Sequence, residues 1–355
     1  MKKYRWQLLI LLLTGVVVGI LLLLERRGGL GEASTPQPVS GGVYTEALIG
    51  SLQRLNPLLD DGNSVDRDVD SLIFSGLVRF DSRGIAQSDL AESVGVSQDG
   101  ILYNIILKPN LTWHDGEPLT TRDVLFTIEL IRNGGNYVSS DIKDLWKSVE
   151  VYIFDDKTMQ LKLPESYAPF MDYLDFEILP QHLFDGMTIK QIADSPLNLA
   201  PIGSGPFQFV ELITADSTIT GVRLKAFPGY SGKQPFLQEV VFRYYPDAQS
   251  AYNDLTAGLV QGISEIPNAL LNQALTNENL DLYTGRLPRI SLVLLNLDDV
   301  GVQFFQEKEV RKALMMGINR KAIINELFDG QAIEANGVIL PGTWAYNEPT
   351  QSLDY

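Results

Sequence analysis

Two glycine-rich segments carry residues that could support catalysis, but neither has the spacing of a known catalytic motif. Residues 229–233 end in the glycine and lysine of a phosphate-binding loop, yet Phe227 stands where that loop has its first glycine. Ser204 lies between two glycines, as a nucleophilic serine can, but Pro206 would disturb the helix that must follow such a serine. Both segments are therefore interpreted as turns.

The histidine and cysteine content restricts the remaining chemistry. The chain has two histidines and no cysteine, which excludes disulfides, thiolate metal sites, a cysteine nucleophile and a histidine-rich metal site. His114 precedes Asp115, but it is interpreted as a structural turn residue beside Trp113 rather than as an acid or base. Acidic residues are abundant, and the sequence does not give the carboxylate separation that a glycosidase needs. We assign no catalytic residue, metal ligand or cofactor, and we expect no enzyme activity.

The charge balance indicates which partners the protein avoids. The formal net charge of the 355 residues is −16, and the first 27 residues are basic. Without that segment the rest of the chain carries about −20, which repels a phosphate backbone. Nucleic acid is therefore not expected as a partner.

The N-terminal segment predicts export across a membrane. Three basic residues precede the apolar run of residues 8–24, and a second charged group ends it. The run is long enough to span a bilayer, and its flanking charges predict a cytoplasmic N-terminus. The nearest candidate for a signal cleavage site, residues 32–34, is weak. Residues 1–27 are therefore expected to be a transmembrane anchor or uncleaved signal, followed by a flexible linker over residues 28–40.

Short strands and helices alternate along the exported part of the chain. Alternating apolar residues and turn signals predict strands over residues 43–49, 77–80, 93–96, 102–107, 149–153, 158–163, 207–211, 222–226, 240–244 and 291–295. Turn residues between 93–96 and 102–107, and between 149–153 and 158–163, predict that each of these two pairs forms a hairpin. Apolar residues at helical spacing predict helices over residues 66–74, from 121 onward, 248–257, 309–316 and 321–328. The spacing of Thr120 and Asp123 is that of a capping box. The pattern indicates an α/β protein with mixed sheets.

The order of several short motifs resembles the extracellular solute-binding proteins of family 5, the oligopeptide, dipeptide and nickel type that serve ABC importers. The most specific block is Thr112-Trp113-His114-Asp115-Gly116-Glu117-Pro118-Leu119-Thr120, followed by Asp123-Val124. Colinear matches are Leu55-Asn56-Pro57, Asp89-Leu90-Ala91-Glu92-Ser93, Leu179-Pro180-Gln181-His182-Leu183, Pro201-Ile202-Gly203-Ser204-Gly205-Pro206 and Glu309-Val310-Arg311-Lys312-Ala313-Leu314. The resemblance runs from about Gly41 to the end of the chain.

The resemblance implies a multi-lobed periplasmic-binding-protein-like fold of type II, cluster C. A discontinuous first lobe would comprise residues 41–59 and 201–265, with an inserted lobe over residues 60–200. A third lobe, hinged to the first, would comprise residues 266–355. Family members usually continue further, so this lobe is expected to be incomplete and to leave unpaired sheet edges and exposed apolar surface. A truncated product, a split gene or a fragment would each give such a chain.

The resemblance also implies where a ligand binds. Cleft-lining positions of the family correspond to Ile49, Gly50, Ser51, Leu52 and Gln53, with a weaker candidate at Ser264 and Glu265 near the hinge. A simple surface loop is the alternative interpretation of the first segment. Trp113, His114 and Asp115 belong to the inserted lobe and are expected to maintain the fold rather than to contact ligand.

The resemblance implies a binding component of an importer that works as a monomer with ABC permease subunits outside the cytoplasmic membrane. A peptide is the expected ligand, a nickel complex is less favoured because histidine is scarce, and an oligosaccharide stays open. The alternatives are a secreted membrane-anchored hydrolase and a ligand-sensing receptor domain without a transport role.

Overall fold

The structure is a computed structural model that describes residues 12–17, 39–81, 83–285, 287, 289–341, 343 and 345–347. Residues 12–17 are helical, and the rest of the predicted anchor and most of the linker lie outside the described residues. Among the residues that are described, no helix is both long and apolar enough to cross a membrane.

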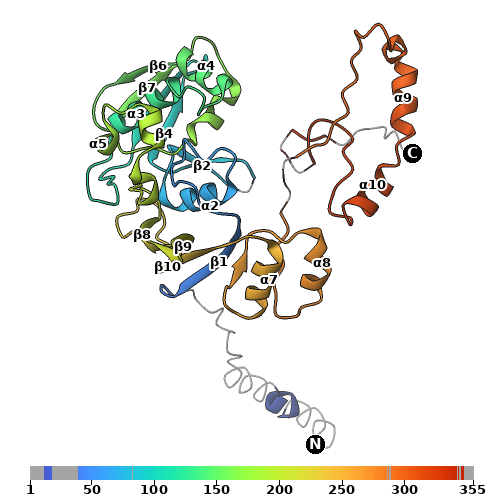
Figure 1. Cartoon of the computed structure of the whole chain (residues 1–355), viewed down its shortest axis with the longest axis horizontal. Coiled ribbons are helices and arrows are strands. Elements are labelled where there is room, and N and C mark those ends of the chain that lie inside the picture. The colour runs from blue at the N-terminus through green and yellow to red at the C-terminus, as the bar shows by residue number, and fades with distance from the viewer. Residues whose placement is uncertain are drawn as a thin grey trace, which may run out of the picture.

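A five-stranded sheet forms the base of the molecule (Figure 1), with strand order β11-β1-β10-β9-β8. Its strands are β1 (Val43–Ile49), β8 (Phe207–Ala215), β9 (Thr218–Ala226), β10 (Glu239–Tyr245) and β11 (Gly262–Ile263). Strand β1 runs parallel to both of its neighbours, whereas β9 is antiparallel to β8 and β10. The carboxyl ends of β11, β1 and β10 therefore lie at the same edge of the sheet.

The two faces of this sheet are covered by different helices. Because side chains alternate along a strand, Leu48 of β1 packs with α2 (Ser64–Ile73) on one face. Ala47 packs with Ala251 of α7 (Ala248–Thr256) on the other. Helix α2 presents valines and an isoleucine at four-residue spacing to the sheet, so it shares the sheet's core. The predicted lobe boundary at residue 60 stays a prediction.

The segment between β1 and β8 contains a second sheet with order β4-β5-β7-β6. The elements of this segment are β2 (Val78–Phe80), β3 (Ala86–Ser88), β4 (Ala91–Val96), β5 (Leu102–Leu107), α3 (Thr121–Arg132), α4 (Ser140–Ser148), β6 (Glu150–Ile153), β7 (Thr158–Lys162), α5 (Gln181–Phe184) and α6 (Ile189–Ala193), with 3₁₀ helices at Ala168–Leu174 and Pro196–Leu199. Trp113, Trp146 and Phe170 are fully buried in its core. Both predicted hairpins are confirmed as antiparallel pairs.

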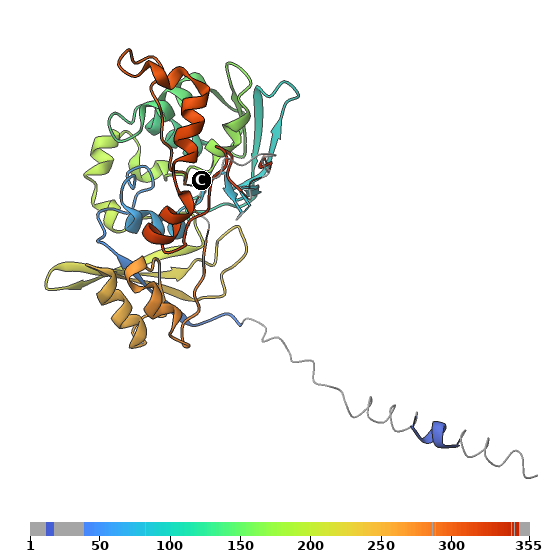
Figure 2. The same cartoon turned by 90° about the vertical axis from the view of Figure 1, so that its right-hand side faces the viewer.

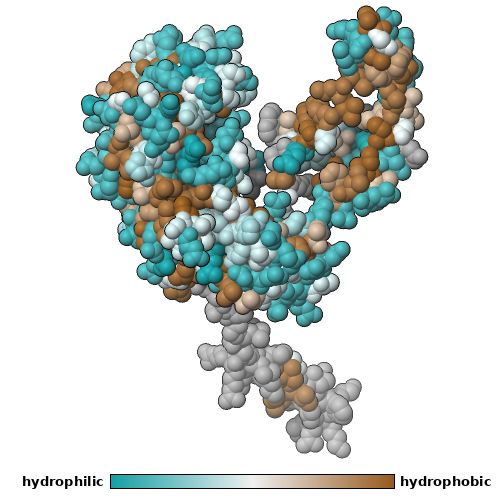
Figure 3. All heavy atoms as spheres, in the orientation of Figure 1, coloured by the Kyte–Doolittle hydropathy of each residue, from teal (hydrophilic) through white to brown (hydrophobic). Residues whose placement is uncertain are grey.

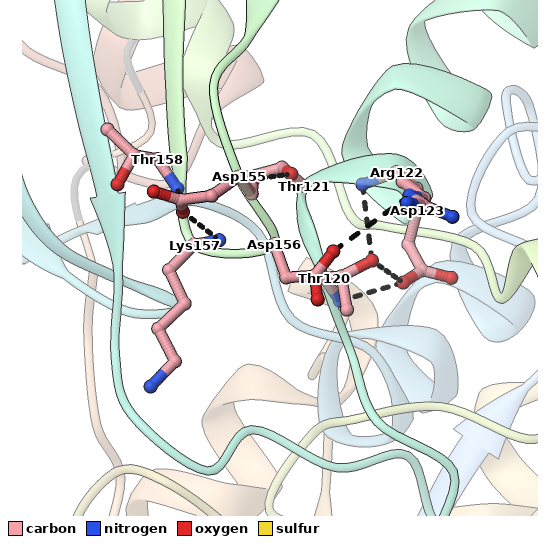
Figure 4. Close-up of polar contacts among 8 residues, drawn as sticks. All are labelled: Thr120, Thr121, Arg122, Asp123, Asp155, Asp156, Lys157 and Thr158. Atoms are coloured by element: carbon pink, nitrogen blue, oxygen red, sulfur yellow. Dashed lines mark hydrogen bonds and ion pairs between the residues drawn. The ribbon is translucent and has the colours of Figure 1, made fainter.

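The start of α3 is fixed to the turn of the β6–β7 hairpin (Figure 4). The predicted capping box is present, and the backbone N–H of Thr120 donates to Asp123 Oδ2 over 2.8 Å. The hydroxyl of Thr121 donates to the carbonyl of Asp155 over 2.6 Å. The capping box thus begins the helix, and the adjacent Thr121 positions it against the hairpin.

The C-terminal part continues through α8 (Asn268–Leu275) to an arm that rises beside the body (Figures 1 and 2). The arm carries a 3₁₀ helix at Gln303–Gln306, α9 (Lys308–Met316) and α10 (Arg320–Leu327), and Asn319 caps the start of α10. None of the residues in these three helices is buried. Figure 3 shows the resulting run of exposed apolar side chains along the arm.

The predicted strand over residues 291–295 is wrong. This segment is irregular, and Leu294 is 87% exposed. An apolar stretch becomes a strand only when another strand satisfies its backbone groups. No described residue pairs with it, so its local preference is not realised.

Candidate ligand-binding site

The two predicted ligand-binding segments lie at the same edge of the five-stranded sheet. Residues 50–54, here named the β1 loop, follow β1, whereas Ser264 and Glu265 follow β11. Residues Glu46 and Ala47 of β1 pair with β11 in parallel, and the backbone N–H of Ser264 donates to Ala47 O over 3.3 Å. In open α/β sheets, ligands bind outside the carboxyl ends of parallel strands. The topology therefore places both segments where this rule expects a ligand.

The β1 loop begins with a glycine that few other residues could replace. The backbone N–H of Gly50 donates to Tyr245 O, at the end of β10, over 2.8 Å. Its φ is +135°, and a Cβ at this position would lie 2.9 Å from Val65 Cγ2 of α2. The chain can therefore turn tightly from β1 onto the first turn of α2 only because residue 50 has no side chain.

The amino-terminal turn of α2 supports the middle of the loop. Asp66 Oδ1 accepts the backbone N–H of Gln53 over 2.9 Å, and Oδ2 accepts that of Arg54 over 3.1 Å. The side chain of Asn63, which also caps α2, donates to Ser51 O over 3.1 Å. The side chains of Asn63 and Asp66 thus fix three residues of the loop.

The far end of the loop is fixed by a buried amide network. Leu55 is buried, and its backbone N–H donates to Asn198 O over 2.7 Å. The side chains of Asn56 and Asn198 are hydrogen-bonded to each other over 3.1 Å. The asparagine of the Leu55-Asn56-Pro57 motif therefore joins the loop to the 3₁₀ helix at Pro196–Leu199.

The loop leaves backbone donors free. Gly50, Ser51 and Gln53 are exposed, whereas Leu52 turns into the core. The backbone N–H groups of Ser51 and Leu52 have no acceptor among the described residues. Two free N–H groups in a fixed loop can donate to a carbonyl or carboxylate of a ligand without regard to its side chains. Sequence patterns alone did not indicate the supporting roles of Asp66 and Asn198.

Buried acidic residues lie behind the loop. Burial raises the pKa of Asp70 well above its ordinary value, and the nearby carboxylates of Asp60 and Asp66 add to this effect. Burial likewise raises the pKa of Glu177 to about 7 and that of Asp60 to about 6. In the described part of the chain, no group of three or more His, Cys, Asp or Glu residues could hold a metal ion. Burial therefore favours the protonated, uncharged form of these carboxyl groups.

Asp70→Leu is expected to raise the free energy of unfolding by about 2 kcal/mol at pH 7, because Asp70 is buried and neither carboxyl oxygen has a hydrogen-bond partner in the structure. Because the pKa of Asp70 is higher in the native state than in the unfolded chain, ionisation of Asp70 lowers the free energy of unfolding as the pH rises above the unfolded-state pKa. The gain should therefore be larger at pH 7 than at pH 4 in urea denaturation. Burial also raises the pKa of Asp68 in the same helix, but less than that of Asp70, so Asp68→Asn should give a smaller gain. An equal or lower stability of Asp70→Leu at pH 7 would contradict this account.

The predicted structural role of His114 agrees with its contacts. His114 Nδ1 accepts the backbone N–H of Gly203 over 3.2 Å, and Nε2 lies 3.1 Å from Gly205 O. Because a carbonyl only accepts, Nε2 carries the proton. Asp115 pairs with His182 over 2.8 Å. The contacts of His114 join the Trp113–Asp115 turn to the segment around Ser204, whose hydroxyl is buried and has no hydrogen-bond partner in the structure. That of Asp115 joins the turn to α5.

Comparison with known proteins shows the family of this chain. Residues 86–355 match the model of the bacterial extracellular solute-binding proteins, family 5, middle region. The chain belongs to this family. The family 5 chain is 30% identical over 352 residues to the dipeptide-binding protein of Escherichia coli strain K12, covering 92% of this chain and 64% of that protein.

Solved structures show the same fold. The structure of NikZ from Campylobacter jejuni, in complex with Ni(L-His), has a TM-score of 0.69 at 28% identity, covering 88% of this chain and 60% of NikZ. That of the oligopeptide-binding protein AppA from Bacillus subtilis, in complex with a nonapeptide, has a TM-score of 0.68 at 26% identity, covering 90% and 62%. The predicted periplasmic-binding-protein-like fold is confirmed. The family 5 chain spans less than two thirds of the length of these relatives.

Proposed function

We propose that this family 5 chain is the solute-binding component of an ABC-type importer and that it binds a peptide or similar small solute. Family membership and the relatives named as dipeptide- and oligopeptide-binding proteins support this function. The ligand binds between the first and third lobes, which close on it by a hinge, and is then delivered to the permease subunits.

The β1 loop is the observation that carries the proposal. It lies at the carboxyl ends of three parallel strands, is fixed from α2 and from Asn198, and has free N–H groups at Ser51 and Leu52. Backbone donors suit a transporter of many peptides, because every peptide offers carbonyl acceptors whatever its side chains. Ile49 to Gln53 form the main contact surface, and Ser264 and Glu265 form a second one beside it.

The protein acts outside the cytoplasmic membrane as a monomer and performs no chemistry on its ligand. Residues 1–27 anchor it, with the basic N-terminus in the cytoplasm, and residues 28–40 connect the anchor to the body. The basic residues before an apolar run and the linker composition support this placement.

Native mass spectrometry of the full chain, purified from its own host, tests the proposed function. Bound species with peptide masses, released on denaturation, are the expected result. The same preparation is incubated with a panel of generic esters and glycosides. Absence of bound peptides together with ester or glycoside turnover that is lost on substitution of one carboxylate would overturn the proposal in favour of a hydrolase.

A further inference from the structure

The β1 loop is fixed at four places, and at only one of them does a single side chain bond to the loop backbone twice. Gly50 is bonded through the backbone of Tyr245, and Leu55 through the backbone of Asn198. Between them, the adjacent N–H groups of Gln53 and Arg54 both donate to the carboxylate of Asp66. The side chain of Asn63 donates to Ser51 O. The loop centre therefore depends on two side chains, and Asp66 makes two of the three bonds.

The carboxylate of Asp66 bonds to the β1 loop and does not act only as a helix cap. It lies in the first turn of α2, where the helix dipole favours a negative charge. Its spacing from Asn63 is that of a capping box, yet its two oxygens bond to the preceding loop rather than only to its own helix. Asp66 is 1% exposed, so it does not contact a ligand directly.

Asp70 is a second buried aspartate of α2, and it does not bond to Gln53 or Arg54. It lies one turn further along α2 and is also 1% exposed, but its carboxylate has no hydrogen-bond partner in the structure. The two aspartates share helix, face and burial, and they differ in their contact with the loop. Asp70 is therefore a matched control for Asp66.

We propose that Asp66 is a positioning residue for ligand binding, which fixes the β1 loop so that the free N–H groups of Ser51 and Leu52 are held in one arrangement. This inference rests on the proposed function of the loop. A loop that is already ordered loses less conformational freedom when ligand binds, so the support from Asp66 contributes to affinity through preorganisation.

The test compares Asp66→Ala, Asp66→Asn and Asp70→Asn in the full chain. Alanine peptides from dialanine to pentaalanine serve as probes in isothermal titration calorimetry, and hydrogen exchange is followed over residues 49–55. Asp66→Ala should weaken binding about tenfold, since two charge-assisted hydrogen bonds are lost from the loop. Exchange at Gln53 and Arg54 should become faster. Asp66→Asn keeps one acceptor oxygen and should recover part of the affinity, whereas Asp70→Asn should leave binding and exchange unchanged.

The outcomes separate this inference from the proposed function. Wild-type affinity for alanine peptides in Asp66→Ala would overturn the positioning role while peptide binding stands. An equal loss of binding in Asp66→Ala and Asp70→Asn, in step with their melting temperatures, would also overturn it, because that pattern indicates general destabilisation. If the wild-type chain takes up none of the peptides, peptide binding fails. In that case, hydrogen exchange still tests the role of Asp66. If Gln53 and Arg54 exchange as slowly in Asp66→Ala as in the wild type, Asp66 does not fix the loop.

Discussion

Trp113→Ala is expected to lower the free energy of unfolding of the segment between β1 and β8 by about 4 kcal/mol, within the range for truncating a buried aromatic residue. Trp113 is 0% exposed and packs in the core formed by the four-stranded sheet and α3. Its backbone also closes the turn that carries His114, through a 2.9 Å hydrogen bond from its N–H to Glu117 O. Removal of the side chain therefore leaves a large cavity next to the joint between the two sheets.

Trp113→Phe separates the effect of volume from that of polarity. The indole Nε1 of Trp113 is buried and has no hydrogen-bond partner in the structure. Replacement by phenylalanine therefore breaks no hydrogen bond and should cost less than half as much as Trp113→Ala. Urea denaturation followed by circular dichroism, which does not depend on the altered indole, measures both variants. A wild-type midpoint in Trp113→Ala would show that this core does not support the segment.

Local sequence signals predicted those elements whose bonds are local. The Thr120–Asp123 capping box and the two hairpins are confirmed, because each is completed within a few residues of chain. The strand over residues 291–295 was predicted from composition alone and is wrong, since a strand depends on a distant partner. The short helices α5 and α6 gave too few residues for a periodic pattern.

The candidate site was only partly predictable for the same reason. The family resemblance implied the loop after β1 as a candidate, but the carboxylate that supports this loop was not visible in the sequence. Asn63 and Asp66 have capping-box spacing, which would assign Asp66 to its own helix. Its bonds to Gln53 and Arg54 depend on how β1 approaches α2. Likewise, nothing near Asn198 in the sequence indicates that it bonds to Asn56, 142 residues away.

His114 should make the protein sensitive to acid between pH 6.5 and pH 4. Burial lowers the pKa of His114 from 6.5 to about 4 in the native state. Protonation of Nδ1 would also remove the acceptor for the backbone N–H of Gly203. Because the unfolded chain takes up a proton at a higher pH than the native state, stability is fully present above pH 6.5 and is lost as pH falls towards 4. The loss amounts to about 3 kcal/mol.

The acidic residues behind the β1 loop act in the opposite direction over the same pH range. The raised pKa values of Glu177 and Asp60 favour the native state at low pH, so the stability profile of the wild-type protein is the sum of opposing effects. The difference between wild type and His114→Gln isolates the histidine, because both proteins contain the same carboxylates. This difference in unfolding free energy, from urea denaturation, should shift by about 3 kcal/mol against the wild type between pH 7 and pH 4. His182→Gln, which removes the other histidine, should keep the wild-type acid sensitivity assigned to His114. A pH-independent difference between wild type and His114→Gln would show that His114 does not remain neutral in the joint between the two sheets.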